Sequence, residues 1–136
     1  MDILVPNVCY VAKMGKGLTN EQIVQKAASL AEKRIGGKGR IAGTRKHTYA
    51  EKLIKKYQKV YGDRGLKLES TWKDHILQNT RRVKGATRID VWDSVNNIAY
   101  DFKFTINPGN GLKQSQIDKI LKHGPAGLKA VKEINP

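Results

Sequence analysis

Cysteine is nearly absent from this chain of 136 residues, long hydrophobic runs are missing, and acidic residues are few. The single cysteine, Cys9, excludes an internal disulfide and offers no spacing typical of a cysteine metal site. Because no run of about 18 apolar residues occurs, the sequence predicts no transmembrane helix and no membrane anchor. Residues 1–6 also lack the basic and apolar regions of a secretory signal. Hydrophobic residues make up 39% of the chain, which is enough for one folded domain with its own core.

Basic residues greatly outnumber acidic residues in this chain. The chain has 26 Lys and Arg against 12 Asp and Glu, a net charge of +14. This excess indicates a polyanionic partner, nucleic acid first, with an anionic membrane surface or an acidic protein as alternatives. Three of the 12 acids, Asp90, Asp93 and Asp101, nevertheless fall within 12 consecutive residues. Carboxylates repel phosphates, so this cluster favours a protein that cuts phosphodiester bonds with a metal ion over one that only binds them.

The acidic cluster lies in a predicted β-hairpin over residues 88–104. Apolar and polar residues alternate on both sides of the asparagines at 96–97, which tolerate the positive φ of a tight turn. Pairing about that turn would set Asp90 opposite Lys103, with Asp101 on the same face roughly 5–8 Å away. Two carboxylates beside a cation suit a divalent metal and a charged transition state. The alternative is a surface hairpin whose Asp and Lys pair across the strands for under about 1 kcal/mol.

Helical periodicity predicts three helices. A capping box at Thr19 opens the first helix, which extends to about Arg34. A second capping box at Thr48 opens another helix, which ends at Gly62. The third helix covers residues 115–123.

The remaining segments predict strands and connections. Residues 66–72 and 129–134 alternate as strands. Residues 36–46 are rich in glycine and basic residues and predict a flexible linker that binds a phosphate backbone. Residues 1–17 predict a short strand or an ordered arm, and residues 107–111 predict a loop.

The predicted order after residue 48 is helix, three strands, helix and strand, which indicates an α/β sandwich with a mixed sheet. Residues 1–43 would form an N-terminal extension with one helix and the basic linker, and residues 44–136 would form the core.

This order resembles the PD-(D/E)XK nuclease superfamily. An acid, Glu69, lies on the first strand, Asp90 lies on the second, and Asp101-Phe102-Lys103 forms the D-x-K motif on the third. The tripeptide alone is common by chance, and its weight comes from the hydrophobic strand, the upstream Asp and the preceding helix. The resemblance covers roughly residues 44–134 and implies a restriction-endonuclease-like αβββαβ fold with an added N-terminal helical segment.

A narrower resemblance is to the C-terminal toxin domains of contact-dependent growth inhibition and Rhs-type polymorphic toxins. It implies an endonuclease that is secreted as part of a larger effector and cuts DNA or tRNA in the cytoplasm of a target bacterium, with DNA slightly favoured. It also implies an acidic cognate immunity protein. The domain is expected to be a monomer when this immunity protein is not bound. The segments that carry the likeness are residues 46–53, 61–66, 88–91 and 100–104.

The expected metal ligands are Asp90, Asp101 and Glu69. Carboxylates suit Mg²⁺, which is the expected cofactor, and Mn²⁺ or Zn²⁺ are alternatives. The ion would polarise the scissile phosphate and lower the pKa of a bound water. Lys103 would orient that water or stabilise charge on the phosphate. Glu69 and Lys103 have a simpler interpretation as surface residues that pair with neighbouring charges or with solvent.

Two residues of the second helix join the catalytic candidates. The resemblance implies that Glu51 contributes to the metal site, but Glu51 also stands where a capping box with Thr48 needs a glutamate. His47 is a candidate for phosphate contact or acid–base chemistry, or a histidine of a basic loop without either role. Trp72 and Trp92 are expected to serve packing rather than base stacking, with Trp72 on the inward face of its strand.

The candidate nucleic-acid-binding surface consists of basic residues in three groups, each of which is otherwise a solvated face. Three alternatives to a toxin nuclease remain: a non-catalytic nucleic-acid-binding module, a housekeeping junction-resolving nuclease, and a basic domain that docks on an acidic protein. The basic candidates are Lys38, Arg40, Arg45, Lys46, Lys55, Arg81, Arg82, Lys84 and Arg88.

Overall fold

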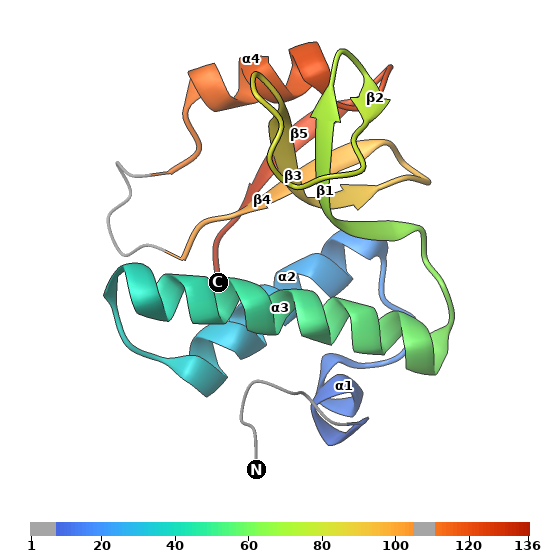
Figure 1. Cartoon of the computed structure of the whole chain (residues 1–136). Coiled ribbons are helices and arrows are strands. Elements are labelled where there is room, and N and C mark those ends of the chain that lie inside the picture. The colour runs from blue at the N-terminus through green and yellow to red at the C-terminus, as the bar shows by residue number, and fades with distance from the viewer. Residues whose placement is uncertain (1–7, 105–110) are drawn as a thin grey trace.

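A five-stranded mixed sheet lies between two helical layers in the computed structural model, which describes residues 8–104 and 111–136 (Figure 1). The strand order is β2-β1-β3-β4-β5, with β4 and β5 parallel and the other neighbours antiparallel. None of the described helices is long and apolar enough to cross a membrane. The elements are α1 Val8–Met14, α2 Asn20–Ile35, α3 Gly39–Tyr61, β1 Leu66–Lys73, β2 Ile76–Leu77, β3 Thr87–Asp93, β4 Ile98–Phe102, α4 Gln114–His123 and β5 Ala130–Ile134.

The two faces of the sheet bury separate hydrophobic clusters. The larger cluster joins α1, α2 and α3 to one face, where the buried strand residues include Leu66, Val91 and Tyr100. The smaller cluster lies on the other face beneath α4 and is centred on Ile120 and Trp72. The sequence prediction of a mixed α/β fold is therefore confirmed, with the sheet between helices on both sides.

Most predicted elements are present at nearly the predicted bounds. Thr19 caps α2 through the reciprocal bonds with Gln22 that define a capping box. Gly62 ends α3 as predicted, and the strands β1, β3, β4 and β5 and the helix α4 follow in the predicted order. A short strand that the sequence did not indicate, β2, pairs with the end of β1.

The flexible linker predicted over residues 36–46 is wrong, because α3 already begins at Gly39. The buried stripe of α3 starts at Lys46 and continues through Tyr49 and Ala50 at helical spacing. Lys46 is only 3% exposed, and its ammonium contacts Glu32 at 2.8 Å. A pattern of apolar residues does not include this lysine, so the sequence pattern did not indicate the first turns of the helix. As a consequence α3 runs without a break across residue 43, where the sequence predicted the start of the core.

Three further predictions are wrong at the level of local structure. Residues 8–14 form the helix α1 rather than a strand or arm. Residues 1–7 lie outside the described residues, as do residues 107–110 of the loop predicted at 107–111. Thr48 lies in the interior of α3, so it caps nothing and Glu51 is not a capping-box residue. Trp72 does not share an inward face with Leu66, because Leu66 packs toward α3 and Trp72 toward α4.

The change of face occurs at Glu69. This residue has a φ of 45°, in the left-handed region that side chains with a Cβ rarely adopt. It lies between the paired positions Leu68–Val91 and Ser70–Ile89, so its register partner on β3 is Asp90. The distortion interrupts the alternation of side chains in β1 and β3. Leu66 and Val91 before and opposite it face α3, whereas Trp72 and Ile89 on its other side face α4.

The β3–β4 hairpin has a different register from the predicted one. The turn contains four residues, 94–97, and the Asp93 carboxylate accepts hydrogen bonds from the backbone N–H groups of Val95 and Asn96. The pairs Val91–Tyr100 and Asp93–Ile98 place Asp101, rather than Lys103, level with Asp90. The prediction that Lys103 faces Asp90 is wrong by two residues, because the longer turn shifts the strand.

Candidate active site

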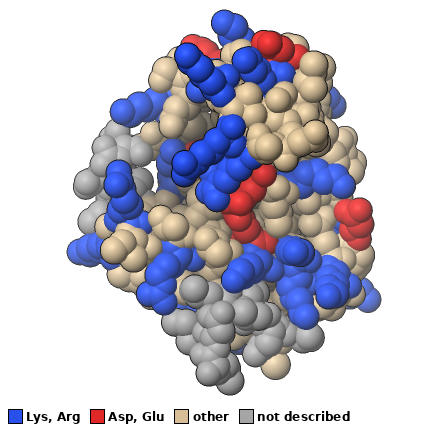
Figure 2. All heavy atoms as spheres, viewed as in Figure 1, with Lys and Arg blue, Asp and Glu red and all other residues tan. Residues whose placement is uncertain are grey.

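Six of the predicted catalytic side chains converge where α3 meets the sheet. His47 and Glu51 are one helical turn apart on α3, and their carboxylate and imidazole groups face the strands. Figure 2 shows acidic side chains in a band across the middle of this face, with Lys and Arg on both sides of the band. The strand residues of the group are Glu69 on β1, Asp90 on β3, Asp101 on β4 and Lys103 just after β4.

His47 stands at the centre of this group. Its Nε2 atom lies 2.9 Å from Oε1 of Glu51 and 3.1 Å from Oδ1 of Asp90. The ring also packs edge-on against Phe102, with 5.3 Å between ring centroids. Burial disfavours the charged imidazole, but the bonds and charges of Asp90 and Glu51 outweigh it and raise the pKa of His47 to about 10. Without a metal ion, the imidazolium therefore neutralises part of the acidic group.

The two strand aspartates lie against each other. The Phe102 N–H donates to Oδ2 of Asp90 at 2.9 Å, which fixes that carboxylate at the point where β3 and β4 part. Burial and the neighbouring Asp90 charge raise the pKa of Asp101 to about 6. Lys103 opposes this effect, since its Nζ lies 3.1 Å from Oδ2 of Asp101. The D-x-K residues thus form a close ion pair beside the Asp90 carboxylate.

Glu69 adds a carboxylate to the group from β1. Its side chain is exposed and lies 3.0 Å from Arg88, which neutralises it in part. Burial and the nearby Glu69 carboxylate raise the pKa of Glu51, while His47 counteracts this effect. A residue in the left-handed region thus carries a carboxylate into a cluster of like charge. Such local strain is characteristic of functional sites rather than of stable sheet interiors.

The donor atoms of this group fit a divalent metal ion. One atom each from His47, Glu51 and Glu69 lies within 4.8 Å of the others, a spacing that one ion can bridge. Three buried atoms of the site also lack a hydrogen bond of acceptable geometry among the residues described: Nε2 of His47, Oε1 of Glu51 and Oδ2 of Asp101. All three atoms lie in ion pairs instead, His47 with Glu51 and Asp101 with Lys103, so a metal ion would compete with these cations for the two carboxylate oxygens.

The site borders a basic groove of about 970 Å³. His47 and Lys103 are among its lining residues, and Lys38 and Arg40 line the part formed by the start of α3. Two acids, Glu32 and Glu133, also line it, and Glu32 pairs with the buried Lys46. A phosphate chain in this groove would meet Lys38 and Arg40 and, beside the acidic group, Lys103.

The predicted nucleic-acid-binding residues divide into three kinds. Lys46 is buried and holds α3 to the end of α2, through Glu32 and the Gly37 carbonyl, so its predicted contact with nucleic acid is wrong. Arg88 is exposed but paired with Glu69. The side chains that remain exposed are Lys38, Arg40, Arg45, Lys55, Arg81, Arg82 and Lys84.

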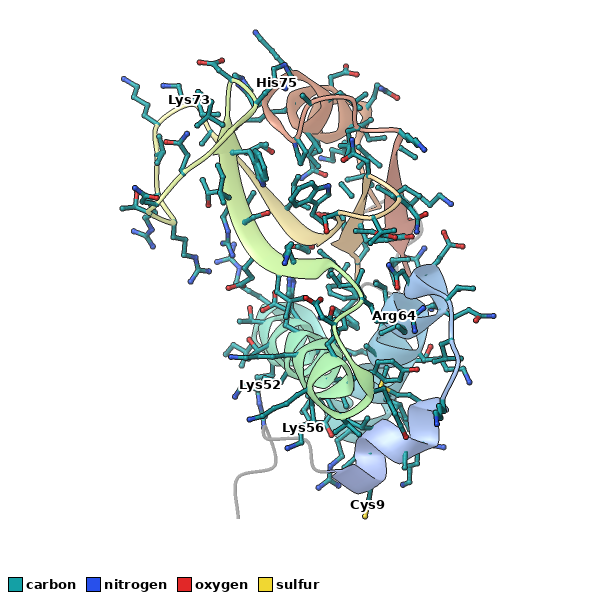
Figure 3. All side chains as sticks on the ribbon, turned by 90° about the vertical axis from the view of Figure 1, so that its right-hand side faces the viewer. Cys9, Lys52, Lys56, Arg64, Lys73 and His75 are labelled. Carbon is teal, nitrogen blue, oxygen red and sulfur yellow. The ribbon has the colours of Figure 1, made fainter. Side chains whose placement is uncertain are left out.

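Basic side chains from two segments lie on one side of the molecule. Figure 3 shows that the half-exposed Lys52 on α3 and the loop between β2 and β3 project toward the same side. That loop carries the exposed residues Arg81, Arg82 and Lys84.

The prediction from sequence did not place His47 and Glu51 on the same helix, facing the strands together. Their spacing of four residues places both on one face of a helix, which is a usable signal. The mistaken cap at Thr48 concealed it by placing His47 in a loop. Comparison of the chain with models of known protein families, with curated protein sequences and with solved structures gives no match. What the site does must therefore be argued from its own geometry.

Proposed function

We propose that this protein is a metal-dependent endonuclease. The observation that carries the proposal is the convergence of His47, Glu51, Glu69, Asp90 and Asp101 with Lys103 beside a groove that Lys38 and Arg40 also line. Carboxylates in a strongly basic protein serve no purpose in simple phosphate binding, whereas metal-assisted hydrolysis needs both charges. The element order α3, β1, β3, β4, α4, β5 supports a restriction-endonuclease-like fold as part of the same proposal.

Each side chain has a role that follows from its position. A bound divalent ion would lower the pKa of a water molecule and withdraw charge from the scissile phosphate. Asp90 and Asp101 would hold the ion, and the Phe102 N–H keeps Asp90 oriented for this purpose. Lys103 would stabilise the negative charge that develops on the phosphate, because its ammonium lies at the groove beside Asp101.

The donor set favours particular metals. Imidazole nitrogen suits Zn²⁺, whereas Mg²⁺ and Mn²⁺ suit carboxylate oxygen. With His47 among the donors, we expect Zn²⁺ to support cleavage at lower concentration than Mg²⁺, the ion that the sequence favoured. Metal binding must displace the proton that His47 shares with Asp90 and Glu51.

The proposed setting is that of an effector domain acting on DNA or tRNA in a target bacterium. The net charge of +14 supports an acidic immunity protein that covers the basic groove and the acidic group together. DNA remains slightly favoured over tRNA as the substrate.

The test is cleavage by the purified chain. Plasmid DNA and total tRNA are incubated separately with Mn²⁺, Zn²⁺, Mg²⁺ or EDTA, beside Asp101→Asn and the matched control Asp118→Asn, which removes a carboxylate from the distant helix α4. We expect metal-dependent cleavage by the wild type and by the control, and none by Asp101→Asn. Salt-sensitive binding without cleavage in any metal would instead identify a binding module.

A further inference from the structure

A second concave surface adjoins the acidic group at Glu69 and shares no lining residue with the basic groove. It has a volume of about 440 Å³ and lies over β1, between the end of β3 and the segment that follows β2. Glu69, which belongs to the acidic group, forms part of its wall. Anything bound here is therefore adjacent to the candidate metal site.

Both tryptophans of the chain line this pocket. Trp72 and Trp92 contact each other edge to face, with 5.2 Å between their ring centroids. Their indole N–H groups are used within the protein, by Ser70 for Trp72 and by Asn97 for Trp92. The two rings are thus held in place without a free hydrogen-bond donor. Trp72 is 7% exposed, so the aromatic surface that the pocket offers belongs mainly to the half-buried Trp92. Leu77, which is 56% exposed, adds apolar surface at the same pocket.

The rest of the lining is polar and basic. Asn79 and Arg81 lie on the segment after β2, and the Arg81 carbonyl accepts a hydrogen bond from Thr71, which attaches that segment to β1. Lys67 lies beside Trp92 as its register partner. Within the described part of the chain, neither Lys67 nor Arg81 has an acidic partner within ion-pair distance. An aromatic wall, a free amide and two available cations are what a nucleobase with its attached phosphates requires.

We propose that this pocket receives one unpaired base of the substrate, next to the phosphate at the acidic group. The inference rests on the proposed endonuclease function and specifies its substrate class. A base inside a duplex is stacked and paired, so it reaches such a pocket only where the strand is single or locally open. The enzyme therefore prefers single-stranded or looped nucleic acid over perfect duplex.

Core packing alone does not account for these features. Packing explains Trp72, which is 7% exposed, because it contacts Ile120 and Ile89 in the smaller hydrophobic cluster. It does not explain why Leu77 stays exposed, or why Asn79 and Arg81 border the same aromatic surface. A base-binding pocket explains all of these together.

Tryptophan fluorescence tests the pocket directly, because both emitters line it. The full chain is titrated in EDTA with a short single-stranded oligodeoxynucleotide of mixed sequence, with its blunt duplex, and with the same sequence as RNA. We expect saturable quenching by the single strands and about tenfold weaker apparent affinity for the duplex, the order of effect that base stacking on aromatic residues provides. The DNA and RNA arms show which single strand is preferred.

Variants separate this pocket from general electrostatic attraction. Asn79→Ala with Arg81→Ala should weaken single-strand quenching about tenfold, while Lys59→Ala, an exposed cation on α3, should leave it nearly unchanged. In the presence of metal, the double variant should lose the preference for cleaving single strands over duplex.

The outcomes distinguish the pocket from the nuclease proposal. Equal quenching by duplex and single strand, or no quenching with cleavage intact, overturns the pocket and leaves the nuclease standing. Single-strand quenching that depends on Asn79 and Arg81, without cleavage in any metal, supports the pocket and overturns the nuclease.

Discussion

Asp101 shows at the scale of one residue how function and stability oppose each other. Its pKa is raised to about 6, chiefly by burial and then by Asp90. A carboxyl group whose pKa is higher in the folded state than the ordinary 3.8 is destabilising once it ionises. The penalty is therefore absent at low pH and complete above about pH 6. At neutral pH, which lies above this pKa, the carboxyl group is ionised in spite of the penalty.

Asp101→Asn should abolish cleavage and make the metal-free protein more stable. At neutral pH in EDTA we expect the free energy of unfolding to rise by about 2 kcal/mol, because the buried charge is removed. The gain should disappear at about pH 4, where the native carboxyl is protonated. Urea unfolding at the two pH values measures it. An equal effect at both values, or a loss of stability at neutral pH, would contradict this interpretation.

His47 titrates in the opposite sense. Its pKa rises from 6.5 to about 10 in the folded, metal-free chain, so its favourable contribution is complete below pH 6.5 and declines as the pH approaches 10. His47→Gln should therefore destabilise the metal-free protein near pH 6 and much less near pH 10. The same substitution should weaken Zn²⁺ binding, measured by calorimetry, by about tenfold or more. Unchanged metal affinity would remove His47 from the ligand set.

At the scale of the secondary-structure element, the sequence predicted what depends on local pattern. The capping box at Thr19 needs only four neighbouring residues, and it is present. The start of α3 depends on the fold as a whole, because Lys46 becomes an inward residue only when Glu32 and Gly37 stand beside it. The hairpin register failed for a similar reason, since the Asp93 carboxylate organises a longer turn than the asparagines alone indicate.

In the candidate site, too, the features that depend on local pattern were predictable and those that depend on the whole fold were not. Alternation placed Asp90 and Asp101 on adjoining strands, and spacing placed Lys103 beside them. The distortion at Glu69 has no sequence signature, because a glutamate with a φ of 45° is held there by surrounding structure. The approach of His47 and Glu51 to the strands likewise depends on how α3 crosses the sheet.

The distortion in β1 can be tested by Glu69→Gly against Glu69→Gln. Glycine adopts a φ of 45° without steric cost, so Glu69→Gly should be about 1 kcal/mol more stable than Glu69→Gln. Both variants lose the carboxylate, and both should cleave at least about tenfold more slowly than the wild type. Thermal unfolding separates the backbone effect from the charge effect. Glu69→Gln being the more stable variant would argue against strain at this position.

For the whole molecule, the charge of +14 predicts how binding responds to salt. Contacts from about six exposed cations would reduce affinity for DNA about a thousandfold between about 50 and 200 mM salt. Replacing Lys38 and Arg40 together by alanine should lower the slope of log affinity against log salt by about two. Fluorescence anisotropy of a labelled oligonucleotide in EDTA measures the slope.

Lys46→Met is the control for that experiment. It should leave the salt slope unchanged, because the ammonium is buried, while it lowers the free energy of unfolding by about 1–3 kcal/mol through the lost contacts with Glu32 and Gly37. A reduced slope in Lys46→Met would place this lysine on the nucleic-acid surface after all.

The unequal division of the core across the sheet bears on which part of the molecule opens first. Among the described residues, seventeen buried side chains join the sheet to α1, α2 and α3, and four form the cluster beneath α4. Amide protons of α4 should consequently exchange with solvent through a partial opening that requires less free energy than the opening that exposes α3. The helix α4, which packs behind the tryptophan pair, would then open while α3, which carries His47 and Glu51, stays folded. The tryptophan pocket could therefore change shape when it binds a ligand, whereas the positions of the candidate catalytic side chains would not change.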